Sequence, residues 1–184
     1  MVWNEILSFV FIACSALIYA CSLQCNTKNK IFLVQLFSTC IYLASYIVIV
    51  NIRAAALIGA ITAAVEILRI IAFYLIEKTT KFDTRRVNGL TALFFSLLLV
   101  VCAIFAWSGW ICLLPVVGGI IVSFAMGSKN LLMMKIAFAI QSILITIYLF
   151  LLTLWFNAFS QVFVLIFSII GLITFLAKRN HQKI

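Results

Sequence analysis

The chain has 184 residues, of which 67% are apolar and 9% are charged, and its formal net charge is +9. Soluble domains average roughly 45–50% apolar and about 25% charged residues, so this composition excludes a soluble protein and predicts an all-α, multi-pass membrane protein. The longest polar interval, Glu77 to Gly89, is too short for a soluble domain. Because the basic residues lie between apolar segments, we expect them to face the anionic lipid headgroups of a bilayer and not nucleic acid.

Seven apolar segments are candidates to cross a bilayer, which takes about 20 residues in a helix. In chain order they are Ile6–Leu23, Ile31–Val50, Ala54–Ile76, Leu90–Trp107, Trp110–Met126, Leu131–Leu152 and Ala158–Ala177. The weakest boundary is the two-residue break Ser108-Gly109 between the fourth and fifth segments.

The distribution of basic residues supports this boundary. With seven helices, eleven basic residues fall on one side of the membrane and only Arg53 falls on the other. The eleven are Lys28, Lys30, Lys78, Lys81, Arg85, Arg86, Lys129, Lys135, Lys178, Arg179 and Lys183. Since cytoplasmic loops carry the excess of positive charge, we predict an external N-terminus and a cytoplasmic C-terminus.

The two halves of the chain have a similar order of segments. Shifting the sequence by 102 residues places Tyr46 on Tyr148 and aligns the ends of the third and seventh segments. A lone helix between two triplets gives both triplets the same orientation, so the pattern predicts a parallel internal repeat. We therefore expect a three-helix bundle over 1–76, a cytoplasmic loop and linker helix over 77–109, and a second three-helix bundle with a basic tail over 110–184.

The third segment carries two charged residues, Glu66 and Arg69, in its middle. Residues three apart on a helix share a face, and a lone charge in lipid is costly, so such residues pair or mark a pathway. In one interpretation they form a self-satisfied pair that orients the helix. In the other they face a substrate path, where Arg69 meets an anionic or polar group and Glu66 is available for protonation.

Other polar residues follow helical spacing on the second and seventh segments. They are Gln35, Thr39, Tyr42 and Tyr46 on the second, and Asn157, Gln161 and Ser168 on the seventh. Each of them alone is explained by hydrogen bonding between helices. Because equivalent faces of the two triplets are polar or small, we favour the lining of a central substrate path for the set.

Pro115 is the only proline, and Gly118 and Gly119 follow it closely. Proline in a helix interior removes a backbone hydrogen bond and bends the helix. The three residues therefore predict either a passive kink or a hinge in the fifth helix.

Two stretches of the sequence carry recognisable motifs. The first runs from Asn29-Lys30 through Gln35, Tyr46 and Val65-Glu66-x-x-Arg69 to Tyr74, and the second from Trp107 through Leu113-Leu114-Pro115, Gly118-Gly119, Lys129-Asn130 and Tyr148 to Ser168–Arg179. Together they resemble the YgjV-like family of bacterial inner-membrane proteins. That family is similar to SWEET, PQ-loop and PnuC-type transporters, so the resemblance implies two three-helix bundles around a central path and a location in the bacterial inner membrane. It implies no particular substrate.

An enzyme, a metal site and a cofactor are not expected. The six cysteines fall mostly inside apolar segments, and the single histidine, His181, lies in the C-terminal tail. A metal site takes about four nitrogen or sulfur ligands, and an intramembrane enzyme needs a nucleophile with a base or clustered metal ligands. We expect a transporter or facilitator of a small polar solute; the alternative is a non-transporting accessory or receptor-like membrane protein. The substrate, its coupling to protons and assembly into a homo-oligomer stay open.

Overall fold

The computed structural model describes residues 2–50, 56–79, 84–105, 109–128, 130–151 and 155–181. Over these residues the fold is entirely helical. Its elements are α1 (Val2–Gln24), α2 (Lys28–Val50), α3 (Ala56–Thr79), α4 (Thr84–Phe105), the short 3-10 helix η1 (Trp110–Cys112), α5 (Leu113–Gly127), α6 (Leu131–Leu151) and α7 (Trp155–His181). The expected helix ends Ala54, Trp107 and Leu152, the break residue Ser108, and the basic residues Arg53, Lys81, Lys129 and Lys183 lie outside the described residues.

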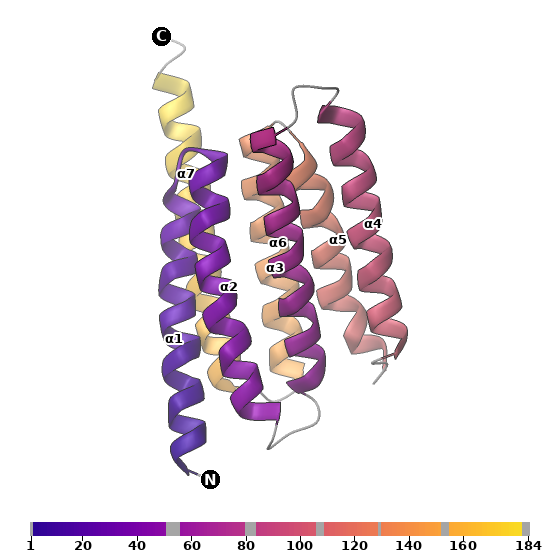
Figure 1. Ribbon diagram of the computed structural model, residues 1–184. Coiled ribbons are helices and arrows are strands. Elements are labelled where there is room, and N and C mark those ends of the chain that lie inside the picture. The colour runs from indigo at the N-terminus through magenta and orange to yellow at the C-terminus, as the bar shows by residue number, and fades with distance from the viewer. Residues whose placement is uncertain are drawn as a thin grey trace.

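The long helices coincide with the seven predicted segments. Six of those in the described ranges are long and apolar enough to cross a membrane, and α3 is not among these six. It carries Glu66, Arg69, Glu77 and Lys78 within its 24 residues. This set of parallel and antiparallel apolar helices (Figure 1) is the architecture of a multi-pass membrane protein.

The boundary between the fourth and fifth helices is confirmed. α4 ends at Phe105, and η1 begins at Trp110 directly after Gly109. Gly109 has a φ angle of +115°, a conformation that side chains with a Cβ rarely adopt. Glycine at this position therefore lets the chain leave the helical path before α5 starts.

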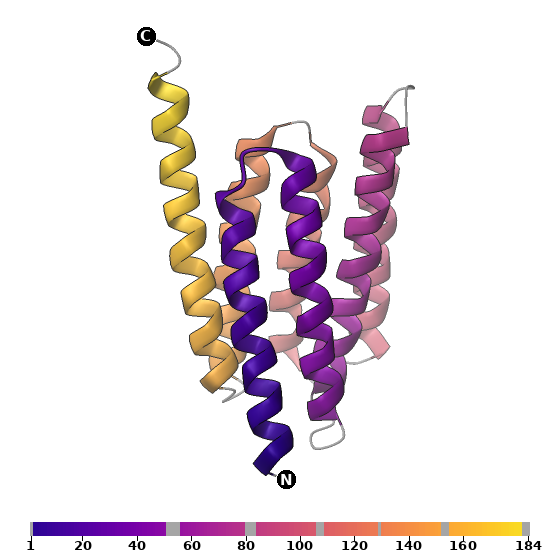
Figure 2. The same ribbon diagram turned by 60° about the vertical axis from the view of Figure 1, so that its left-hand side comes forward.

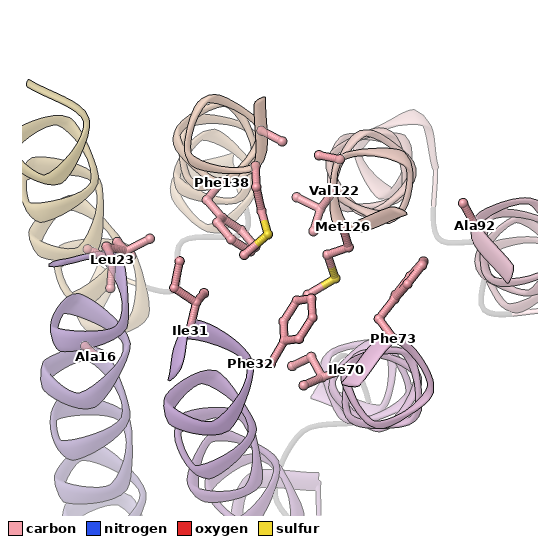
Figure 3. Close-up of a cluster of buried hydrophobic side chains, with 14 residues drawn as sticks. Ala16, Leu23, Ile31, Phe32, Ile70, Phe73, Ala92, Val122, Met126 and Phe138 are labelled. Atoms are coloured by element: carbon pink, nitrogen blue, oxygen red, sulfur yellow. The ribbon is translucent and has the colours of Figure 1, made fainter. Parts of the chain in front are cut away.

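The helices pack chiefly against their neighbours in the chain, and α1 also packs against α7. The row α1, α2, α3 faces the row α7, α6, α5, and α4 lies outside both rows against α3 and α5 (Figure 3). The two rows contact each other at both of their outer edges, through α1 with α7 and through α3 with α5. The division into two separate three-helix bundles and the orientation in the membrane stay predictions.

Successive helices run in opposite directions, so the basic residues collect at one end of the molecule. This end holds the α1–α2 turn, the end of α3, the start of α6 and the C-terminal part of α7, and it lies at the top of Figures 1 and 2. We call it the basic end, and the end that holds the N-terminus the opposite end. Lys135, one turn inside α6, is buried, unlike the exposed Lys30, Lys78 and Lys178 at this end, and its Nζ donates a hydrogen bond to the backbone oxygen of Leu23.

The largest cluster of buried apolar side chains lies toward the basic end. We call it the main core; it consists of Ala16, Leu23, Ile31, Phe32, Ile70, Phe73, Ala92, Val122, Ala125, Met126, Met134, Ala137, Phe138 and Val164. Every long helix contributes to it, and Figure 3 shows Phe32, Ile70, Met126 and Phe138 pointing into the space between the two rows. Because lipid is as apolar as these side chains, close packing and not removal from water holds the helices together here.

Polar contacts between helices add to the packing at the basic end. Lys28 and Glu77 form an ion pair of 3.0 Å that joins α2 to α3. The amide of Gln24 donates to the oxygen of Phe167, and that of Asn88 donates to the oxygen of Gly127, each over 3.2 Å. These contacts join α1 to α7 and α4 to α5, so the basic end is fastened at several points around the bundle.

The outer surface is apolar, whereas much of the interior is polar. Phe37, Leu90, Phe105 and Phe159 expose between 63% and 88% of their surface, while Arg69 and Gln35 are buried. A soluble protein has the reverse distribution. The hydrocarbon of a bilayer covers an apolar outer surface without a cost in free energy.

Candidate functional site

Two adjoining cavities lie between the two rows of helices, each with a volume of about 60 Å³. They share Tyr42, Glu66, Gln141 and Ile145 as a common wall. The first cavity reaches toward α1 and α7, and the second reaches toward α4 and α5. A water molecule needs roughly 10–15 Å³ of such volume, so each cavity has room for a few waters.

The cavities lie next to the main core, between it and the opposite end of the molecule. Along α2 the core residue Phe32 is followed by the cavity residues Thr39 and Tyr42, and along α6 Phe138 is followed by Gln141. On α3 and α5, which run toward the basic end, the cavity residues come before the core residues. A polar layer near the middle of the helices therefore adjoins an apolar layer that closes it toward the basic end.

Arg69 projects from α3 into the contact with α5. Its side chain exposes only 2% of its surface, and its Nη1 donates to the oxygen of Gly119 over 2.8 Å and to Ser123 Oγ over 3.1 Å. Hydrogen bonds from a charged donor are roughly twice as strong as neutral ones, so this guanidinium firmly joins two helices. A Cβ at Gly119 would lie 2.7 Å from Cδ1 of Leu99 on α4 and at an ordinary contact distance of 3.8 Å from Arg69 Nη1, so the glycine chiefly makes room for Leu99.

Glu66 is held much more loosely than Arg69. Its Oε1 lies 3.6 Å from Arg69 Nη2, beyond the range of a hydrogen bond, and its side chain keeps 20% of its surface exposed. It lines both cavities. The predicted pair therefore exists, but its two members differ: Arg69 fastens α3 to α5 and Glu66 faces the cavities.

Tyrosine side chains line the same two cavities as Glu66. Four of the five tyrosines in the chain, Tyr19, Tyr42, Tyr46 and Tyr148, line one cavity or both. The hydroxyls of Tyr42 and Tyr46 are 2.8 Å apart, and the two rings meet edge to face with centroids 4.8 Å apart.

The same two hydroxyls connect the two rows of helices. Tyr42 has a side-chain hydrogen bond with Gln161, and Tyr46 has one with Asn157. Both partners belong to α7, so these contacts join α2 to α7 across the first cavity. The hydroxyl groups of Tyr42 and Tyr46 thus already have hydrogen-bond partners within the protein.

Most of the predicted site residues meet at the cavities. Thr39, Tyr42, Tyr46, Glu66, Arg69, Gln161, Pro115 and Gly119 line one or both, and Asn157 contacts Tyr46. Gln35, Ser168 and Gly118 do not line them. Gln35 and Ser168 are buried nearer the basic end. In the part of the chain that the structure describes, both amide atoms of Gln35 and the hydroxyl of Ser168 have no hydrogen-bond partner.

The place of Pro115 differs from the one expected. It is the third residue of α5, so it lies in the first turn and not in the interior of the helix. Proline is well tolerated in a first turn. Because η1 runs directly into α5 and the N–H of Leu113 donates to the oxygens of Trp110 and Ile111, this helix start is not isolated. A passive kink and a hinge at Pro115 both stay predictions. Gly118 provides close contact instead, because a Cβ there would lie 3.2 Å from Gln141 Cγ.

The sequence predictions missed Tyr19, Gln141, Ser142 and Ser123. Gln141 lies on α6, whose polar residues were not considered as a set. The shift of 102 residues that aligns Tyr46 with Tyr148 also aligns Thr39 with Gln141, and all four line the cavities. That alignment was the signal that could have identified Gln141.

The described residues offer no group of three or more His, Cys, Asp or Glu side chains placed to hold a metal ion. None of the six cysteines, all of which lie in the described residues, forms a disulfide, and Cys14, Cys21 and Cys40 lie on the outer surface. The chemistry available at the cavities is therefore that of one carboxylate, one guanidinium, amides and hydroxyls.

Fold and site together define a multi-pass helical membrane protein with polar cavities between its helices. Comparison with known protein families, with characterised proteins and with solved structures finds no match to the chain. The resemblance to the YgjV-like family therefore stays a prediction.

Proposed function

We propose that this protein is a transporter or facilitator of a small polar solute, whose path runs between the row α1–α3 and the row α5–α7. The observation that carries the proposal is the pair of polar cavities at the middle of the helices, next to an apolar core that closes them toward one end. Intramembrane polar and ionisable residues that face a cavity are typical of solute pathways.

Two buried polar residues support a path that continues beyond the cavities. Gln35 and Ser168 lie on α2 and α7 at the level of the main core, and neither side chain has a hydrogen-bond partner among the described residues. Leaving a buried polar group without a partner costs about 1–3 kcal/mol. These groups would gain hydrogen-bond partners if the core opened and admitted water or solute. Such an opening is what a transport path that is open alternately to the two sides of the membrane requires.

The contacts between the rows also support the proposal. α1 meets α7 at one edge and α3 meets α5 at the other, so the first helix of each triplet packs against the third helix of the other. This is the pattern expected of a parallel repeat about an axis along the membrane normal. With the proposed orientation in a bacterial inner membrane, the main core closes the path on the cytoplasmic side.

The test is solute uptake into proteoliposomes, measured with labelled sugars, nucleosides, amino acids and vitamins against protein-free liposomes. On a cysteine-free background, Thr39→Cys places a thiol in the first cavity. Phe37→Cys, two residues away on α2, is the matched control, because Phe37 exposes 67% of its surface on the outside of the bundle.

We expect uptake of at least one solute class, and we expect a thiol reagent to block it in the Thr39→Cys variant and not in the Phe37→Cys variant. Equal effects of the reagent in both variants would contradict a path through the cavities. Folded protein that binds a solute but moves none would favour the accessory or receptor-like alternative.

A further inference from the structure

We propose that Glu66 and Gln141 bind an ammonium group of the solute. The inference rests on the proposed function for the path itself, but binding is a separate property that can be measured without transport. It names the chemical class of the solute, a small molecule with a charged amino group, either a cation or a zwitterion.

One terminal nitrogen of Arg69 is engaged by α5. Its Nη1 donates to Gly119 and Ser123, and its side chain is 2% exposed. An anionic solute would meet only the remaining donors of this buried side chain, beside the like-charged carboxylate of Glu66. Arg69 is therefore a positioning residue that joins α3 to α5, and not the main contact for a solute.

Gln141 and Glu66 both offer hydrogen-bond acceptors at the cavities. Gln141 is 7% exposed and lines both cavities, and its Oε1 has no hydrogen-bond partner among the described residues. Glu66 lines both cavities and has its nearest cation at 3.6 Å. A ligand that satisfies both residues must supply hydrogen-bond donors, and an ammonium group supplies three with a positive charge.

The aromatic walls suit the same ligand. Tyr19, Tyr42, Tyr46 and Tyr148 lie around the cavities that Glu66 lines. A cation within about 6 Å of a tyrosine ring face is attracted to it, most strongly where water is excluded. The hydroxyls of Tyr42 and Tyr46 already pair with each other, so their rings are the more available surface.

The net charge of the site determines whether a bound solute adds a charge to it. Glu66 and Arg69 together are neutral, so a bound cation adds one positive charge, whereas a zwitterion adds none. The carboxylate of a zwitterionic solute would also face Arg69 Nε, which has no hydrogen-bond partner in the described ranges. Ammonium binding is common to both classes, and the experiment distinguishes them.

The experiment measures thermal stabilisation of the purified full-length protein in detergent by four matched small solutes. Ethanolamine is a cation, glycine a zwitterion, ethylene glycol a neutral analogue and glycolate an anion. We expect ethanolamine or glycine to raise the melting temperature in a saturable way, with an affinity at least about tenfold higher than that of ethylene glycol and glycolate. Stabilisation by ethanolamine alone would identify a cation site, and stabilisation by glycine alone a zwitterion site.

Two variants locate the binding. Glu66→Gln should weaken it by roughly tenfold or more, whereas Glu77→Gln, a carboxylate change at the basic end outside both cavities, should leave it unchanged. If Glu66→Gln does not yield folded protein, Gln141→Leu tests the same site. The proposal is overturned if neither amino solute binds better than both controls, or if binding does not depend on Glu66 or Gln141. Ammonium binding without any uptake would instead contradict the proposed transport function and leave the site in place.

Discussion

At the scale of single residues, the two intramembrane charges do different work. Arg69 makes two hydrogen bonds to α5. Glu66 makes no hydrogen bond with Arg69, since Glu66 Oε1 and Arg69 Nη2 are 3.6 Å apart. A self-contained pair would leave both residues without contacts to another helix. Arg69 instead stabilises the contact between the two triplets, and its removal should affect the fold more than removal of Glu66.

The first prediction follows from this difference. Arg69→Gln should lower the free energy of unfolding by about 1.5–3 kcal/mol, because the charged donor to Gly119 and Ser123 is lost. Glu66→Gln should lower it less, and the double variant should be about as unstable as Arg69→Gln alone. Unfolding in detergent, followed by tryptophan fluorescence, measures all three variants. A double variant as stable as the wild type would show that the two charges depend chiefly on each other.

At the scale of helices, close contact depends on glycine at particular positions. A Cβ on Gly171 of α7 would lie 2.7 Å from the backbone oxygen of Leu23 at the end of α1. That oxygen also accepts the hydrogen bond of Lys135, so three helices meet there. The neighbouring atom belongs to the backbone, so it cannot move aside as a side-chain end would.

The second prediction compares two Gly→Ala substitutions. Gly171→Ala should destabilise the protein by about 1–3 kcal/mol, because the added methyl forces α1 and α7 apart. Gly89→Ala on α4 is the control, since a Cβ there has no heavy atom within 4 Å. Within a helix this change should stabilise by roughly 0.5–1 kcal/mol. The two melting temperatures should therefore shift in opposite directions, and a shared direction would contradict the tight contact at Gly171.

At the scale of the whole molecule, the basic end and the opposite end differ in construction. The basic end has the main core, the ion pair of Lys28 with Glu77 and several hydrogen bonds between helices. Toward the opposite end lie the polar cavities and a smaller apolar cluster of Tyr148, Leu149 and Ala158. This asymmetry is what a solute path closed on one side requires.

The third prediction concerns orientation in the membrane. Trp3, at the opposite end, exposes 82% of its surface, and Asn29, at the basic end, is also exposed. On a cysteine-free background, Trp3→Cys should react with an impermeant thiol reagent in intact cells, and Asn29→Cys should react only after permeabilisation. The physical reason is retention of positive loops on the cytoplasmic side. Labelling of Asn29→Cys in intact cells would show that the orientation is the reverse of the proposed one.

Hydropathy determined the helices by itself. Apolar runs of about 20 residues can satisfy their backbone groups in lipid only as helices, so the segments and even the short break at Gly109 were predictable. Helical spacing also predicted that Thr39, Tyr42, Tyr46 and Glu66 share a polar interior, because polar residues avoid lipid whichever neighbours they meet.

Tertiary structure alone decided which groups pair. Nothing in the local sequence indicates that Arg69 reaches Gly119 and Ser123, about 50 residues away, or that Lys135 is buried against Leu23. Nor does spacing separate Gln35 and Ser168, which lie at the level of the core, from the residues that line the cavities. Such contacts depend on how far each helix is rotated and shifted against the next, and side-chain packing between helices sets those positions.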